Sequence, residues 1–352
     1  MTTKAALNPV IGEDLRFIAG HALPWHEFEG KTVIVSGANG FLPAYMVETL
    51  LYLNDHTHGN RTRVIGIVRD AGKARARFAH HAGRKDFELI VQDICLPLDI
   101  GGGVDYIIHA ASQASPKYYG IDPVGTLAPN VFGTRNLLEL AREKGSKGFL
   151  FFSSGEVYGE ASEIPTGEGS YGRLDPLDVR SCYAESKRMG ENMCACWHAQ
   201  YGVPAKAVRP FHTYGPGLRL DDGRVFADFV SDVVHGRDIT MRSDGSALRA
   251  FCYIADATLG FFKVMLEGKN AEAYNVGNDK GETSILALAG LLAGLFPEKG
   301  LKVIRKEGGQ AKGYMKSPLS RNCPDISKMR SLGWEPEYSL EEGFKRTIRS
   351  YF

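Results

Sequence analysis

Short, almost entirely apolar runs alternate with longer stretches of mixed polarity through the first half of the chain. Runs such as TVIVS at 32–36 and FLFF at 149–152 predict strands that are buried on both faces, and the stretches between such runs predict helices. The expected strands are Thr32–Ser36, Arg63–Val68, Phe87–Val91, Tyr106–His109 and Phe149–Phe152, and the expected helices are Pro43–Leu53, Ala71–His80 and Val124–Glu143. This alternation predicts an α/β protein with a doubly wound parallel sheet.

The pattern differs toward the two ends of the chain. Residues 1–30 mix prolines and glycines with acidic positions before the first strong strand, which predicts an extension packed on the main domain. After about Val208 the alternation becomes irregular and glycine-rich loops are frequent, which is typical of a smaller cap over the carboxyl edge of a sheet. We therefore divide the chain into 1–30, a sheet domain at 31–207 and a smaller α/β domain at 208–352 that is interleaved with it.

Composition and charge exclude several classes of function. The 352 residues include 42 Lys plus Arg and 41 Asp plus Glu, so no net field would recruit nucleic acid or an anionic membrane. Six cysteines without a C-x-x-C pair indicate reduced thiols. No signal peptide and no apolar stretch of about 20 residues is evident, so we expect a cytoplasmic protein that does not enter a membrane.

Histidines give no sign of a metal site in the sequence. His56 and His58, and the pair His80 and His81, lie in polar stretches without carboxylates at the spacing of metal ligands. We therefore expect them on the solvated surface, and we expect no metal.

The sequence SGANGF places Gly37 and Gly40 between a buried strand and a helix. Bare backbone and the N–H groups of a helix end can bind a pyrophosphate there, which is typical of a Rossmann-like dinucleotide site. Pro43 replaces the third glycine of the usual pattern and is tolerated in a first helical turn. The alternative is a simple tight turn.

Residues at the ends of the next two strands bear on the adenosine end of that site. Arg69 follows the second strand, where an acidic residue would hold the ribose diol of NAD, and its guanidinium can bind the 2′-phosphate of NADP. A solvated surface pair between Arg69 and Asp70 is the alternative. Asp93 follows the third strand and either contacts the base or closes a turn.

The sequence RSCYAESKR supplies a candidate catalytic pair. Tyr183 and Lys187 are four residues apart and share one helix face. A tyrosine is a weak base at its ordinary pKa of about 10, but a nearby ammonium and a nicotinamide cation favour the phenolate. The phenolate can take a hydroxyl proton while hydride leaves the same carbon. Ser153 and Ser154, at the tip of an earlier strand, precede the pair in the order that this chemistry needs.

Together, these and further motifs resemble the extended short-chain dehydrogenase/reductase family, which remodels nucleotide sugars with NAD or NADP. The motifs that resemble this family are the glycine turn, HAAS at 109–112, SSGEVYG at 153–159, Y-x-x-x-K and RPFHTYGP at 209–216. The resemblance covers essentially residues 31–352. Within the family, the chain resembles the UDP-glucuronate decarboxylases. The stretches that carry this resemblance are Ala114-Ser115-Pro116, RSCYAESKR, DDGRVFADFV and PDISKMRSLGWEPEYSLEEGFKRTI.

The resemblance implies roles for individual residues and domains. It makes 31–207 the dinucleotide-binding domain and 208–352 mainly the nucleotide-sugar-binding domain, and it implies a homodimer. The implied catalytic residues are Ser154, Glu156, Tyr183 and Lys187. The implied cofactor contacts are Gly37, Asn39, Gly40, Phe41, Leu42, Arg69, Asp93, Ile94, Ala110, Ala111, Ser112, Tyr183, Lys187 and Pro210. The implied substrate contacts are Ser115, Tyr118, Tyr119, Glu156, His212, Arg224, Val225, Arg249 and Arg321, of which Arg249 and Arg321 would hold the diphosphate.

The residues beside Glu156 bear on the reaction that follows oxidation of the sugar at C4. A 4,6-dehydratase needs a second acid beside the glutamate to protonate the departing C6 hydroxyl, and Gly155 stands at that position. A decarboxylase needs no such acid, because the 4-ketone makes its C6 carboxylate a β-keto acid. A 4-epimerase needs neither carboxylate. This comparison favours decarboxylation of a UDP-glucuronate-type sugar, unless Glu156 only caps a helix or loop.

Three positions depart from the decarboxylase pattern. Gly155 replaces the usual serine, His212 the usual asparagine and Ser186 the usual glycine. The first two face the expected substrate region, although His212 can equally be a packed or surface imidazole. A dehydratase or epimerase acting on another nucleotide sugar therefore remains an alternative. A non-catalytic dinucleotide-binding regulator is disfavoured, because it has no use for a phenolate.

Overall fold

A computed structural model describes residues 6–57, 59–305 and 320–352. The strands are β1 (Thr32–Ser36), β2 (Arg63–Val68), β3 (Phe87–Val91), β4 (Tyr106–His109), β5 (Gly148–Phe152), β6 (Ala205–Pro210), β7 (His212–Tyr214), β8 (Ile239–Met241), β9 (Leu248–Tyr253), β10 (Ala273–Val276), β11 (Glu282–Ser284), β12 (Val303–Arg305) and β13 (Arg321–Asn322). The α-helices are α1 (Pro9–Gly20), α2 (Phe41–His56), α3 (Ala71–Arg77), α4 (Pro123–Ala128), α5 (Thr134–Lys144), α6 (Cys182–Tyr201), α7 (Val225–Val234), α8 (Ile254–Glu267), α9 (Ile285–Gly294), α10 (Ser327–Ser331) and α11 (Leu340–Arg349).

Among the described residues, seven parallel strands form the central sheet in the order β10-β6-β5-β4-β1-β2-β3. This confirms the predicted fold class. Strands β1 to β5 lie where the apolar runs predicted them, whereas β6 and β10 were not predicted as strands. The chain order reverses between β1 and β4, which are direct neighbours in the sheet. In such sheets the crevice at the carboxyl ends of these two strands is where ligands bind.

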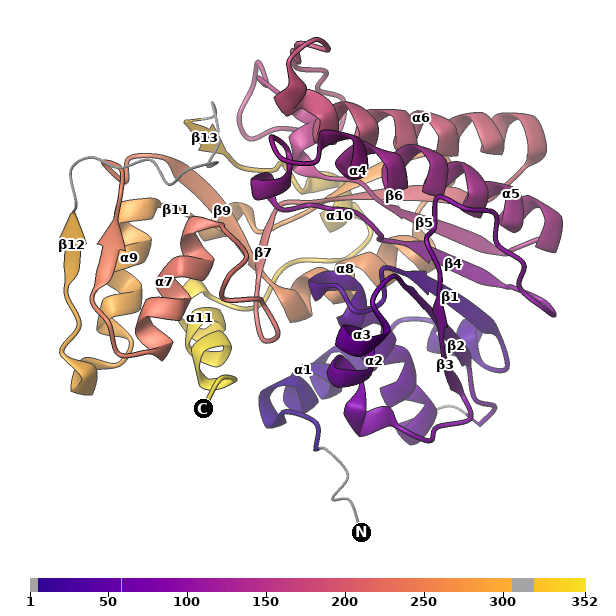
Figure 1. Cartoon of the computed structure of the whole chain (residues 1–352), viewed down its shortest axis with the longest axis horizontal. Coiled ribbons are helices and arrows are strands. Elements are labelled where there is room, and N and C mark those ends of the chain that lie inside the picture. Colours follow the sequence, from indigo (N-terminus) through magenta and orange to yellow (C-terminus); the bar gives the residue numbers. More distant parts are fainter. Residues whose placement is uncertain (1–5, 58, 306–319) are drawn as a thin grey trace.

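Helices cover both faces of this sheet (Figure 1). One apolar core lies between the sheet and α1, α2 and α8, and a second lies between the opposite face and α5 and α6. The expected helix Val124–Glu143 is instead α4, a π-helical turn at Pro129–Gly133, and α5. Pro129 has no backbone N–H to donate, so the regular hydrogen-bond ladder is interrupted there.

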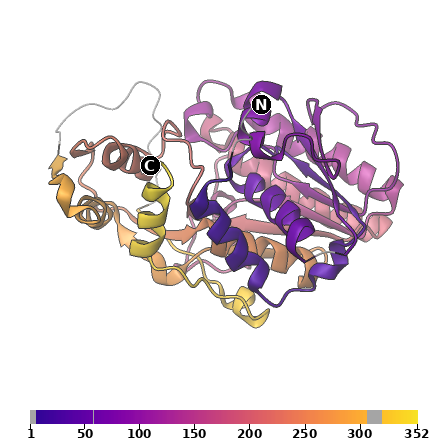
Figure 2. The ribbon, with the colours of Figure 1, turned by 90° about the horizontal axis from the view of Figure 1, so that it is seen from below.

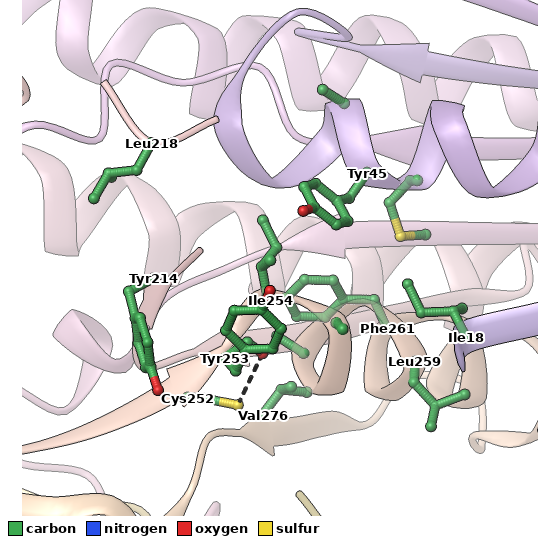
Figure 3. Packing of buried hydrophobic residues seen from close by; sticks show 14 of the residues in the cluster. Ile18, Tyr45, Tyr214, Leu218, Cys252, Tyr253, Ile254, Leu259, Phe261 and Val276 are labelled. Atoms are coloured by element: carbon green, nitrogen blue, oxygen red, sulfur yellow. Dashed lines mark hydrogen bonds between the residues drawn. The ribbon is translucent and has the colours of Figure 1, made fainter. Parts of the chain in front are cut away.

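The N-terminal segment is part of this packing. Helix α1 buries Asp14, whose carboxylate accepts hydrogen bonds from Tyr45 Oη at 2.9 Å and Tyr253 Oη at 2.8 Å. Arg346 of α11 adds a bond to the same carboxylate at 2.6 Å. Figure 3 shows the apolar part of this contact, where Ile18, Tyr45 and Phe261 come together from α1, α2 and α8.

The second half of the chain contributes to both lobes of the molecule. β6 spans residues 205–210, so the division placed between residues 207 and 208 falls within a strand, and β10 and α8 also belong to the main layers. The smaller lobe contains α7, α9, α11 and the short sheets formed by β7, β9, β11, β13 and by β8 and β12. It lies beside the carboxyl edge of the central sheet (Figure 2). Within the described segments, no helix is long and apolar enough to cross a membrane.

Candidate active site

A cavity of about 1950 Å³ lies between the carboxyl ends of the central strands and the smaller lobe. This volume exceeds that of a typical small-ligand pocket, about 300–1,000 Å³, and suits two large ligands at once. The predicted site residues that line it are Gly37, Asn39, Gly40, Phe41, Leu42, Arg69, Asp93, Ile94, Ala110, Ala111, Ser112, Ser115, Tyr118, Tyr119, Ser154, Glu156, Tyr183, Lys187, Pro210, His212, Arg224, Val225 and Arg249.

The glycine turn begins at the end of β1. Gly37 has a φ of +66°, a conformation that side chains disfavour, and its amide donates to Ile67 O at 2.8 Å. A Cβ at Gly37 would lie 2.8 Å from the Cα of Ala111, so only glycine lets this turn pack against the loop after β4. Gly40 then precedes α2, whose first N–H groups receive no side-chain cap. These donors face the cavity that the turn forms.

At the adenosine end of the cavity, Asp70 has a different partner from the one considered in the sequence analysis. Asp70 accepts a hydrogen bond from the Lys73 amide at 3.0 Å and pairs with the Lys73 ammonium at 2.9 Å. The alternative of an Arg69–Asp70 surface pair is therefore wrong, and Arg69 lines the cavity. Asp93 also lines the cavity while its Oδ1 accepts from the Cys95 amide at 2.9 Å, so it closes a turn in the same place.

The predicted catalytic groups come together at the start of α6. Burial raises the pKa of Tyr183 to about 12, although a hydrogen bond with the Ser154 side chain opposes this shift. Burial also lowers the pKa of Lys187 to about 7, and its ammonium donates to Phe152 O at 2.6 Å. Its Nζ lies 5.7 Å from the centre of the Tyr183 ring. The chain alone therefore holds Tyr183 as a neutral phenol, with the serine and lysine placed to assist loss of its proton.

Close packing brings this part of α6 to the sheet. A Cβ at Gly190 would lie 2.3 Å from the Phe151 ring of β5, so the glycine permits the approach that places Lys187 against Phe152 O. Ser186 bonds with Tyr183 O at 2.8 Å and with Asn130 Nδ2 at 3.0 Å. Its hydroxyl therefore ties α6 to the π-helical turn rather than reshaping the cavity.

Glu156 lies in the short 3₁₀ turn that follows β5, Gly155–Tyr158. Ser154 provides the cap of this turn, since its Oγ accepts from the Glu156 amide at 3.2 Å. The Glu156 carboxylate lines the cavity and raises the pKa of Tyr183 electrostatically. At Gly155 a Cβ would meet the Phe211 ring at 3.2 Å. A side chain at this position would therefore require the Phe211 ring to shift by a few tenths of an ångström.

The substrate end of the cavity contains two of the predicted arginines. Arg224 and Arg249 line it, and Arg224 pairs with Asp222. Burial, followed by the charges of these two arginines, lowers the pKa of His212 to about 3. His212 is therefore a neutral imidazole, and its Nδ1 is buried without a hydrogen-bond partner among the described residues.

Two predictions are corrected by the structure. Arg321 does not line the cavity, because its guanidinium binds the Glu282 carboxylate through contacts of 2.7 and 2.9 Å. His80 and His81 are not on the solvated surface, since both Nε2 atoms contact the buried carboxylate of Glu48. His58 lies outside the described residues.

Comparison with known protein families shows which family the chain matches. The model of the NAD dependent epimerase/dehydratase family matches residues 33–277. The chain belongs to this family. It is an NAD-dependent, nucleotide-sugar-modifying enzyme, as its sequence predicted.

Relatives within the family resemble the chain over most of its length. UDP-glucuronic acid decarboxylase 6 of Arabidopsis thaliana is 34% identical over 313 residues, which cover 88% of this chain and 86% of that protein. UDP-glucuronic acid decarboxylase 1 of Xenopus tropicalis is 34% identical over 328 residues, covering 93% and 73% respectively. The structure of a dTDP-glucose 4,6-dehydratase from Streptomyces venezuelae, with NAD bound, has a TM-score of 0.75, 26% identity, and coverage of 91% and 96%.

The residues present fit the NAD of the family. The close packing of Gly37 against Ala111 is one such feature. A second is that, of the eight buried polar side-chain atoms that lack a hydrogen-bond partner in the described segments, five belong to residues lining the cavity. These atoms are Ser112 Oγ, Ser153 Oγ, Arg180 Nε, His212 Nδ1 and Asn322 Oδ1. Because buried polar atoms normally find partners, their concentration here indicates polar ligands.

Arg180 is a site residue that the sequence did not single out. Arg180 lines the cavity near Tyr119; burial raises the pKa of Tyr119, and the charge of Arg180 opposes this rise. Tyr119 stacks on Tyr183 with ring centres 5.2 Å apart. The sequence feature that could have identified Arg180 is its position in RSCYAESKR, three residues before Tyr183.

Proposed function

We propose that this enzyme oxidises a UDP-glucuronate-type sugar at C4 and then decarboxylates it. The observation that carries the proposal is the Glu156 carboxylate in the cavity beside Gly155, which supplies no second acid. The Phe211 ring packs against Gly155. The decarboxylase relatives support the same reaction.

The proton of the C4 hydroxyl is accepted by the Tyr183 oxygen. Bound NAD supplies the acceptor for the hydride of C4 and a positive ring that favours the phenolate. Ser154 holds the Tyr183 oxygen by a hydrogen bond. Lys187 stabilises the developing negative charge, since its ammonium is held within one turn of the helix. Tyr183 and Lys187 thereby lower the barrier for forming the 4-keto sugar.

The next step breaks the bond between C5 and C6. Its electron pair moves onto C5 and the 4-ketone, and C6 leaves as carbon dioxide. Glu156, after taking up a proton from solvent, then delivers it to C5, either directly or through water, in a general acid role worth about 10²–10⁴-fold in rate. Arg180, whose Nε is buried without a partner in the described segments, supplies the positive charge that orients the C6 carboxylate before it leaves.

The diphosphate is assigned to the end of the cavity that contains two of the predicted arginines. Arg224 and Arg249 line this end, and neutral His212 offers an unpartnered nitrogen to the substrate. Arg321 is left out of this assignment because Glu282 already binds its guanidinium.

The test is to incubate the purified enzyme with UDP-glucuronate carrying ¹³C at C6, and to measure labelled carbon dioxide together with the mass of the sugar product. We expect carbon dioxide from the wild type, and losses of at least 100-fold in Tyr183→Phe and Glu156→Gln. Arg321→Lys serves as the matched control, because that residue lies outside the cavity and lysine still pairs with Glu282. An enzyme that turns over UDP- or dTDP-glucose and ignores the uronate would overturn the proposal.

The product distinguishes the alternatives left open by the sequence. Loss of water from a nucleotide hexose would identify a 4,6-dehydratase, and an unchanged mass with altered sugar couplings would identify a 4-epimerase. Bound dinucleotide that no nucleotide sugar ever reduces would identify a regulator.

We also propose that the enzyme is a cytoplasmic homodimer. Exposed apolar side chains at Val124, Phe132 and Met189 lie on the α4 to α6 layer, and burial of this surface against a second copy would remove them from water. Light scattering at a defined concentration measures the mass, and a monomer at micromolar concentration would contradict the dimer.

A further inference from the structure

Glu48, His80 and His81 form a cluster outside the catalytic cavity. Glu48 lies in the middle of α2, and the two histidines end the 3₁₀ turn Ala79–His81 that follows α3. His80 Nε2 lies 3.0 and 3.1 Å from the two carboxylate oxygens of Glu48, and His81 Nε2 lies 2.7 Å from one of them. The side chains are only 6%, 15% and 11% exposed, respectively.

The ligand atoms of this cluster are already convergent. One atom from each residue lies within 4.8 Å of the others, and the two imidazole rings are 4.1 Å apart. Tetrahedral zinc with bonds of about 2.0–2.1 Å separates its ligand atoms by about 3.3 Å. The separations between the histidine Nε2 atoms and the Glu48 oxygens, 2.7–3.1 Å, are a few tenths of an ångström shorter than this.

The chemistry of the three side chains also suits a cation. Two imidazole nitrogens with one carboxylate is a ligand set that zinc and related transition metals bind, whereas calcium and magnesium prefer oxygen ligands alone.

The cluster borders a second cavity, of about 300 Å³, that leaves room for a fourth ligand. Glu48 and His80 line it together with Tyr45, Arg77 and Tyr351. Water entering this cavity can complete a tetrahedral site. The Arg77 guanidinium, which donates to Gly217 O at 3.0 Å and interacts electrostatically with Glu48, opposes a dication. Its charge therefore lowers the affinity below that of a site with the same ligands alone.

We propose that Glu48, His80 and His81 bind one transition-metal dication of the zinc class per chain. The site clamps the turn after α3 to α2, the helix that begins at the dinucleotide turn. The metal is structural in this arrangement, because the cluster belongs to a different cavity from Tyr183 and Glu156.

The experiment is to treat the purified enzyme, with its bound dinucleotide, with a chelator, remove the chelator, and titrate Zn²⁺ by calorimetry near neutral pH. We expect one equivalent per chain and a rise in the thermal midpoint. Co²⁺ should give the visible absorption bands of a site with nitrogen ligands. Absence of stoichiometric binding of either metal would overturn the proposal.

Variants locate the metal on the chain. His80→Asn and His81→Asn keep an amide that can donate to Glu48 but remove a ligand nitrogen, so each should weaken Zn²⁺ binding at least tenfold. His56→Asn is the matched control, since His56 lies on the same helix as Glu48 but is exposed and bonds to Tyr52 O. Urea midpoints of the metal-free proteins verify folding. Undiminished Zn²⁺ binding by a folded His80→Asn/His81→Asn double variant would place the metal elsewhere and overturn the proposal.

Discussion

Replacement of Lys187 by methionine should abolish activity and yet stabilise the fold. The side chain is 2% exposed and surrounded by α6 and the end of β5, where an ammonium has lost its water. Methionine has a similar length and helix propensity and carries no charge to bury. We expect kcat to fall by about 10²–10⁴-fold, because the phenol of Tyr183 loses the charge that assists ionisation.

The magnitude of the stability change follows from the pKa of Lys187. Burial lowers this pKa from 10.5 to about 7. Each pKa unit corresponds to about 1.36 kcal/mol, so the charged form costs the folded state about 5 kcal/mol. Methionine removes this cost but also removes the bond to Phe152 O, which contributes about 1–3 kcal/mol. The variant should therefore gain about 2–4 kcal/mol in free energy of unfolding at or below pH 7.

The sign of the pH dependence distinguishes this explanation from general repacking. Between pH 7 and 10.5 the unfolded wild-type chain binds more protons at position 187 than the folded chain does. The stability of the wild type therefore rises with pH across this range, and the advantage of the variant shrinks. Below pH 7 both states are protonated and the advantage is constant.

Urea unfolding of the wild type and Lys187→Met, after removal of bound dinucleotide from both, measures this difference from pH 6 to 10. Midpoints and slopes are compared at each pH, with refolding curves to establish reversibility. A variant that is less stable than the wild type near pH 7, or a difference that does not change with pH, would refute the reasoning.

Three glycine substitutions test the packing that builds the site. Gly37→Ala places a side chain at positive φ and 2.8 Å from the Cα of Ala111. NAD affinity measured by dialysis should therefore fall at least tenfold, and the free energy of unfolding should fall by about 1–3 kcal/mol. An unchanged NAD affinity would show that this turn does not bind the dinucleotide. Gly190→Ala drives a Cβ to 2.3 Å from the Phe151 ring and should lower both the thermal midpoint and kcat, whereas Gly290→Ala, in an open helical position, should stabilise by about 0.5–1 kcal/mol. Equal midpoints for these two helix variants would contradict the packing described for α6.

The fold was predictable because its signals are local. β1 lies at Thr32–Ser36 as predicted, since a continuous apolar run has no stable place outside a covered sheet. The glycine turn and the Tyr183–Lys187 spacing likewise depend on nearby residues alone. The long helix after β4 was predicted as uninterrupted, although Pro129 carried the signal for the π-helical turn.

The remaining features depend on contacts between distant segments. His80 and His81 look like surface residues in the sequence because Glu48, their partner, lies on another helix. Arg321 matched a ligand-binding arginine, but Glu282 of β11, which lies across β9 from β13 in the same small sheet, neutralises it. The space beside Gly155 is likewise filled by Phe211 from the end of β6. A single sequence does not specify such pairs.

The most direct test of the central claim is to mix the enzyme rapidly with UDP-glucuronate and record the absorbance of reduced dinucleotide. We expect this absorbance to rise before carbon dioxide appears and to rise more slowly when deuterium replaces hydrogen at C4. Tyr183→Phe should show no rise. Carbon dioxide formed at the same rate from both isotopologues, with no reduced dinucleotide at any time, would contradict oxidation at C4.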